Sequence, residues 1–139
     1  MSQWLLFAFI SAGFAALTTV LAKVGVEGVP STLATAIRTI VIGIIAWGIV
    51  AATGEHRQLG SISKRSMMFL VLSGAATGAS WLAYFRALQL APASRVAPID
   101  RLSLPLTIVM AAIFLGEVIS WRVGIGVTLM TIGALLTLG

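Results

Sequence analysis

The stretch IVIGIIAWGIVAA (40–52) decides the class of fold, because it carries no charged side chain at all. It lies within a longer apolar run, residues 32–53, in which Arg38 is the one charged residue. A helix rises 1.5 Å per residue, so about 20 apolar residues are needed to cross a hydrocarbon core about 30 Å thick. The run has that length, and it predicts a transmembrane helix.

The rest of the chain has the same character. Hydrophobic residues make up 59% of the 139 positions and charged residues only 9%, against about a quarter charged in soluble domains. A water-facing surface cannot be built from so few charges, so we expect an all-α integral membrane protein. The net charge of +5 comes from single Lys and Arg residues scattered along apolar segments. This distribution favours anionic lipid headgroups as partners and argues against nucleic acid.

The inventory of reactive side chains is short. The chain has no cysteine, and His56 is its one histidine, so neither a metal site nor another cofactor is expected. Enzymatic activity finds little support in these residues.

Hydropathy and the positions of the breaks predict five transmembrane helices in a single domain, 1–139. Their expected ranges are 4–22, 32–53, 66–90, 93–115 and 121–138. The segment EHRQLGSISKR (55–65) is the clearly aqueous loop. The first run has no Lys or Arg at its amino end and is longer than a signal-peptide core, so it is expected to remain as a span.

Positive charges at the span ends are nearly balanced between the two sides of the membrane. One side carries Arg57, Lys64, Arg65 and Arg122. The other side carries Lys23 and Arg95, joined by Arg38, Arg86 and Arg101 if residues just inside the helix ends are counted. The first side therefore carries four positive residues, and the other side carries two or, with the residues just inside the helix ends, five. By the positive-inside rule the bias is weak, and the chain is predicted to insert both ways up.

Three motifs suggest a family. They are GASWLAYFRALQLAPA (78–93), VAPIDRLSLPLT (96–107) and FLGE (114–117), followed by a glycine-rich last helix. In their order and spacing they resemble a single repeat of the EamA family, in the drug/metabolite transporter superfamily, over nearly the whole chain.

The resemblance implies a transporter. Longer members of the family look like two five-helix repeats fused in inverted orientation, and five crossings leave a second copy inverted by necessity. A lone repeat would need a partner, and inverted repeats commonly build alternating-access carriers with the substrate site at their interface. Together with the weak charge bias, this favours an antiparallel homodimer in the cell inner (plasma) membrane. A parallel dimer and a heterodimer with a paralogue remain alternatives.

Ionisable residues inside spans are costly and usually face protein or water. Here they form one layer, about 6 to 10 Å below one membrane surface at 1.5 Å per residue. Lys23, Arg86 and Asp100 share helix faces with small residues, which indicates interior positions on a substrate or ion pathway. Ser103 and Thr107 lie on the face of Asp100. Arg38 and Arg101 share faces with bulky apolar residues and are predicted to extend toward headgroups, although either could join the pathway.

Asp100 is the one carboxylate well inside a span, and Arg86 is its best-placed partner. A proton-carrying Asp100 and a permanent Asp100–Arg86 ion pair are both open, and the ion pair is favoured because a neighbouring arginine holds an aspartate ionised. Pro98 and Pro105 remove backbone donors, which predicts a kink or hinge and leaves the Arg101 carbonyl without its usual partner.

Aromatic and small residues supply further candidates. Trp81, Tyr84, Phe85 and Leu88 form a stripe that could line the pathway or, as is slightly favoured, face lipid. Gly124, Gly126 and Gly133 mark the last helix as a dimer contact, although packing within one chain explains them equally well. Small four-helix multidrug transporters of the superfamily use a glutamate in the first helix. Residues 7–19 contain no acid, so cationic drug antiport by that route is not expected.

The prediction is therefore a secondary transporter, an exporter or exchanger of a small metabolite. Its rival is a non-transporting membrane subunit or half of a heterodimeric transporter. A net positive layer suggests an anionic, carboxylate-bearing substrate.

Overall fold

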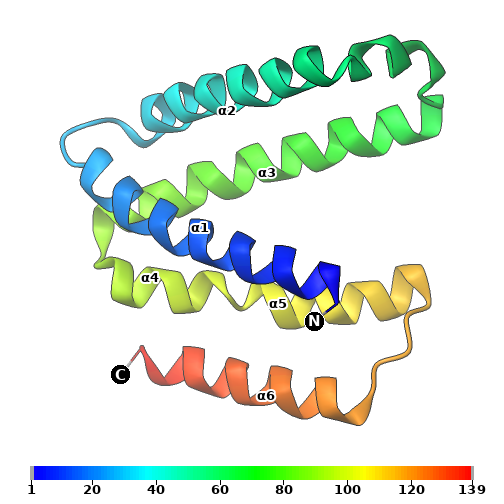
Figure 1. Ribbon diagram of the computed structural model, residues 1–139. Coiled ribbons are helices and arrows are strands. Elements are labelled where there is room, and N and C mark those ends of the chain that lie inside the picture. Colours follow the sequence, from blue (N-terminus) through cyan, green and yellow to red (C-terminus); the bar gives the residue numbers. More distant parts are fainter. Residues whose placement is uncertain (1, 139) are drawn as a thin grey trace. The chain divides into compact units, whose positions relative to one another are not determined.

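The computed structural model describes residues 2–138, and helices make up nearly all of this part (Figure 1). The elements are α1 (Gln3–Gly25), α2 (Ser31–Thr53), the 3-10 helix η1 (Glu55–Ser61), α3 (Lys64–Leu90), α4 (Ala93–Asp100), α5 (Ser103–Met110), the π-helix η2 (Ala111–Leu115) and α6 (Trp121–Leu136). No strand occurs between residues 2 and 138.

Four helical stretches are long and apolar enough to cross a membrane. They are α1, α2, α3 and the stretch Ala93–Leu115, which contains α4, α5 and η2. Each covers one of the first four predicted spans. The predicted fifth span corresponds to α6, an apolar helix of 16 residues. Such a helix is about 24 Å long, somewhat less than the hydrocarbon core.

Local sequence sets several helix ends. Pro30 precedes α2 as its N-cap, so the helix begins at Ser31 and no side chain caps its first turn. The Ser120 hydroxyl caps α6 by accepting a hydrogen bond from the Val123 N–H at 3.3 Å. Gly116 closes η2 as its C-cap with a φ of 68°, a left-handed conformation that glycine adopts without strain.

The chain divides into two compact units. One runs from Leu21 to Gln89, and the other combines the chain up to Val20 with the chain from Leu90 onward. In the first unit, α2 and α3 run antiparallel and are joined through η1 (Figure 1). In the second unit, α4 and α5 both pack against α6.

Few side chains of the described residues are buried. The buried ones are Ala22, Val26, Ala34, Thr35, Phe85, Leu88 and Ala134. Six of these seven belong to the 21–89 unit, where the end of α1, the start of α2 and the end of α3 meet. Exposed apolar side chains lie along α1, α2, α3, α5 and α6, as expected for surfaces that face lipid or another membrane protein.

Hydroxyl groups inside the spans are satisfied locally. Thr39, Thr77 and Thr107 each donate to the carbonyl four residues earlier, at 2.8–2.9 Å. Such bonds remove the cost of an unpaired hydroxyl in hydrocarbon. A threonine can therefore occupy a span without needing a polar partner on another helix.

Gly54→Ala is expected to lower the free energy of unfolding by about 1 kcal/mol, because Gly54 ends α2 with a φ of 74° that an L side chain disfavours. Unfolding in mixed detergent micelles would measure the change. Gly48→Ala is the matched control: Gly48 lies within α2 and an added Cβ there meets open space. That variant should be neutral or slightly more stable. Equal losses in both variants would contradict a conformational role for Gly54.

Candidate functional site

The last turns of α3 carry a stripe of large side chains. Trp81, Phe85 and Leu88 follow one another at spacings of four and three residues, which places them on one helix face. Phe85 and Leu88 are 0% exposed, and Trp81 and Tyr84 are half-buried. The expectation that this stripe faces lipid is therefore wrong for Phe85 and Leu88. Other segments of the 21–89 unit reach this face.

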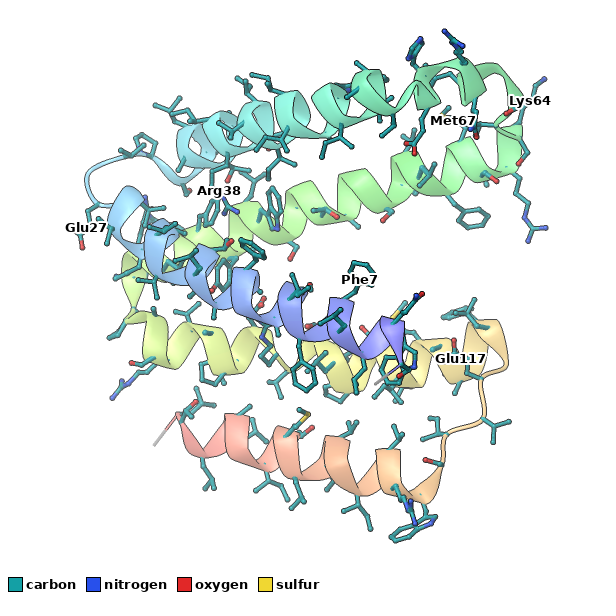
Figure 2. All side chains as sticks on the ribbon, viewed as in Figure 1. Phe7, Glu27, Arg38, Lys64, Met67 and Glu117 are labelled. Atoms are coloured by element: carbon teal, nitrogen blue, oxygen red, sulfur yellow. The ribbon has the colours of Figure 1, made fainter. Side chains whose placement is uncertain are left out.

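Arg38 extends from α2 onto this stripe. Its guanidinium carbon lies 4.8 Å from the centroid of the Trp81 ring and 4.6 Å from that of the Phe85 ring, within the range of cation–π attraction. Figure 2 shows the Arg38 side chain pointing from α2 toward α3. The prediction that Arg38 reaches for headgroups on a lipid-facing surface is wrong. The bulky residues on the same face of α2 indicated that the surroundings of Arg38 are apolar. They did not indicate that α3 provides these surroundings.

Lys23 lies at the end of α1 and also reaches α3. Its Nζ donates to the Leu88 carbonyl at 2.6 Å. Carbonyls in the last turn of a helix lack an intrahelical donor, and a cation is favourable there. Lys23 is half-buried, and it thus caps the end of α3 by its charge as well as by its hydrogen bond.

Gln89, which sequence analysis missed, ties the α1–α2 loop to α3. Its Nε2 donates to the carbonyl of Val29 at 2.6 Å and to that of Val26 at 3.4 Å. The Arg86 guanidinium donates to Gln89 Oε1 at 3.2 Å. An amide in the last turn of an apolar helix was the available signal, because a buried amide needs partners for both its donors and its acceptor.

Gln89→Leu is expected to lower the free energy of unfolding by about 1–3 kcal/mol, since it leaves a partly buried carbonyl without its donor. Gln58→Leu, on the exposed η1 helix, is the control and should change stability little. Chemical unfolding of both variants would test the difference. A Gln89 variant as stable as the control would show that the loop is held by other contacts.

Arg86 itself is exposed, although its face was predicted to point into the bundle. Asp100 is exposed too and ends α4. Because Asp100 belongs to the other unit, the Asp100–Arg86 ion pair stays a prediction. Arg86 acts within its own unit through Gln89.

Two prolines break the predicted fourth helix. Pro98 lies in α4 and Pro105 in α5, and the helix is interrupted at Arg101 and Leu102 between them. The Arg101 N–H bonds to the carbonyls of Ala97 and Pro98, and the Arg101 carbonyl accepts from the Leu104 N–H at 3.0 Å. The expectation of an unpaired Arg101 carbonyl is therefore wrong. Tight turns that bond across three residues replace the missing donor.

The polar residues that follow the break use local partners. Thr107 donates to the Ser103 carbonyl at 2.8 Å, and both residues are exposed. Arg101 is exposed at the break. Their places on a substrate pathway, like the hinge role of the prolines, stay predictions.

The glycines of α6 are not filled by the chain itself. A Cβ added at Gly124, Gly126 or Gly133 would meet nothing within 4 Å, although α6 packs against α4 and α5. Packing of these two helices therefore does not require the three glycines. Their role as a dimer contact stays a prediction.

A hollow of the 21–89 unit lies between the end of α2, η1 and the start of α3. It has a volume of about 710 Å³ and is lined by apolar residues such as Trp47 and Leu70 and by polar ones such as Glu55, Gln58 and Ser63. Most of its lining is exposed. Among residues 2–138, no group of three His, Asp or Glu side chains is placed to hold a metal ion.

Comparisons with known proteins agree with the membrane architecture. The chain matches the EamA-like transporter family over residues 2–139. It is 52% identical over 137 residues to a protein of Sinorhizobium sp. described as an uncharacterized transporter in the cobO 3' region, a match covering 98% of this chain and 97% of that one. No solved structure matches. The resemblance noted in the motifs is confirmed, and this multi-pass membrane protein belongs to the EamA-like transporter family.

Proposed function

We propose that the chain is one half of a secondary transporter, which exports or exchanges a small metabolite by alternating access as an antiparallel homodimer. In this proposal α6 is the fifth span, with the apolar residues beside it completing the crossing. Five crossings put the two termini on opposite sides, so a second copy inserted the other way up supplies the inverted repeat that such carriers use. The inner (plasma) membrane is the proposed location.

The observation that carries the proposal is the near balance of positive charge between the two ends of the helices, which the proposal takes to be five spans. Arg57, Lys64 and Arg65 cluster around η1, whereas Lys23, Arg38 and Arg86 lie at the opposite ends of α1, α2 and α3. Neither side dominates, and the positive-inside rule then gives no strong preference for one orientation. A population inserted both ways up contains both halves of an antiparallel dimer.

Unfilled helix surfaces support assembly with a second chain. The glycine positions of α6 meet open space, as do Gly74 and Gly78 of α3. Small residues at such spacing let a second helix approach closely in lipid, where van der Waals packing is a main source of association energy. The proposal places α6 at the contact between copies.

A non-transporting subunit, or half of a heterodimer, is the second candidate. It is favoured by the way in which the chain's own groups hold its cations, with Lys23 on a helix end and Arg38 on two rings. Charges used in this way stabilise a fold without any substrate. The two candidates differ in whether copies of opposite orientation exist and associate.

Site-directed labelling tests the orientation. The chain has no cysteine, so Ser61→Cys in η1 and Val118→Cys between η2 and α6 introduce unique thiols, both on the same predicted side. A membrane-impermeant maleimide is expected to label each partly in intact cells and fully after permeabilisation. Glu27→Cys, on the other predicted side, should show the complementary fraction. All-or-none labelling at these positions would contradict the antiparallel homodimer.

A further inference from the structure

From the contacts of Arg38 we infer an oxyanion site, and we propose that Arg38 binds the carboxylate of a small dissolved organic acid, the substrate of the transporter. The inference deepens the proposed function and rests on it, because the bound acid is a substrate only if the chain is a transporter. The site is formed by two helices, α2 and α3, which both belong to the 21–89 unit.

Depth makes the Arg38 charge unusual. Arg38 lies seven residues after the first residue of α2, about 10 Å along the helix axis. Its side chain is half-buried, and the span around it has no other charged residue. A cation at such depth is costly unless protein, water or a ligand compensates it.

The compensation that the chain provides is incomplete. Trp81 and Phe85 attract the charge through their ring faces, but ring faces do not replace strong hydrogen-bond acceptors. Within residues 2–138, the Arg38 guanidinium has neither a hydrogen bond nor an ion pair with the chain. Its five N–H groups therefore remain available to a ligand.

The stripe on α3 holds a second cation about one turn away. Lys23 binds the Leu88 carbonyl, and Leu88 follows Phe85 by three residues, a rise of about 4.5 Å. In the part of the chain that the structure describes, no carboxylate contacts Arg38. The charge of Arg38 is thus not balanced by an acidic side chain of residues 2–138, which favours an anion over a cation or a neutral ligand.

The geometry of the guanidinium group indicates which kind of anion fits the site. A guanidinium fork matches two oxygens of a carboxylate or phosphate, and the pairing strengthens when the cation is held in place beforehand. The two rings hold Arg38 in this way. Trp81 lies beside the fork and is only half-buried, so the exposed part of its side chain offers apolar surface to the body of an organic acid.

Lipid phosphate offers the same chemistry, so the test must separate a dissolved acid from a headgroup. Trp81 serves as the reporter after Trp4, Trp47 and Trp121 are replaced by Phe, which leaves one tryptophan. The purified protein in phosphatidylcholine nanodiscs would be titrated with benzoate, acetate and inorganic phosphate at constant ionic strength against chloride. A parallel sample would contain phosphatidylglycerol and no added acid.

We expect a saturable change in Trp81 emission with benzoate or acetate beyond that with chloride. Arg38→Gln should weaken the apparent affinity at least about tenfold, the scale of losing a charge-assisted paired contact. Arg38→Lys should fall between, because it keeps the charge and loses the fork. Arg95→Gln, which removes an exposed arginine from the same predicted membrane side, should bind as the parent does.

Three results would overturn the assignment: no saturable response beyond chloride, an unchanged affinity in Arg38→Lys and Arg38→Gln, or a response produced by phosphatidylglycerol alone. Unfolding curves identify a variant that fails to fold, in which case Arg38→Lys decides. The binding measurement does not depend on the orientation in which the protein inserts into the membrane. One-sided labelling of Ser61→Cys would thus reject the antiparallel dimer while leaving an Arg38-dependent anion site intact.

Discussion

Replacing Phe85 with alanine is expected to lower the free energy of unfolding by about 2–3 kcal/mol, the lower part of the range for a buried phenylalanine. Phe85 is 0% exposed and contacts the Arg38 cation. The transfer contribution shrinks in a bilayer because lipid is as apolar as the protein interior, whereas the cavity left by the ring remains. Loss of one of the two rings also weakens the hold on Arg38.

Denaturant titration in mixed micelles would measure this loss. Phe14→Ala is the matched control, because Phe14 is 65% exposed on α1 and its removal should change stability by no more than about 0.5 kcal/mol. Faster hydrogen exchange at the start of α2 is expected in the Phe85 variant alone. Equal destabilisation by both substitutions would mean that Phe85 does not organise the junction of α1, α2 and α3.

Adding positive charge to η1 is expected to abolish the homodimer. In Glu55→Lys/Gln58→Lys, two further lysines join Arg57, Lys64 and Arg65, and the positive-inside rule then strongly favours one orientation. Labelling of Ser61→Cys should change from mixed to one-sided. Without inverted copies, antiparallel pairs cannot form, so cross-linking between copies should fall to background.

A disulfide at the centre of α6 would measure the pairing. Met130 lies between Gly126 and Gly133 on the predicted contact face, so Met130→Cys meets its counterpart near the crossing point of two α6 helices. Coexpression with the oppositely biased variant Arg57→Gln/Lys64→Gln/Arg65→Gln should restore the cross-link. A one-sided variant that cross-links fully by itself would establish a parallel dimer and contradict the proposal.

Sequence patterns predicted where the helices lie along the chain better than they predicted which helices pack against one another. Continuous apolar runs of membrane length can form little else in lipid, where each backbone group must be satisfied within its own helix. The interruption at Arg101 and Leu102 was visible in Pro98 and Pro105. The partner of the Arg101 carbonyl was not, because it depends on how the backbone tightens after the prolines.

The candidate site was predicted only in part. Lys23 was expected on a pathway. Trp81 and Tyr84 were candidates for it although lipid contact was slightly favoured, Arg38 was predicted to extend toward headgroups, and Gln89 was overlooked. Helix periodicity says which residues share a face, and the face of Arg38 is indeed apolar. It does not say whether lipid or the aromatic rings of α3 cover that face.

The sequence by itself determined the environment and the class of this protein. Its sparse charges require a membrane, its apolar runs form helices, and its motifs identify the EamA-like family. The tertiary structure decided which charge meets which surface. It placed Arg38 against Trp81 and Phe85. It also joined Lys23 of α1 to the end of α3, and Gln89 of α3 to the α1–α2 loop. These contacts join residues more than 40 positions apart, and their geometry depends on the packing of whole helices, which no local pattern of side chains encodes.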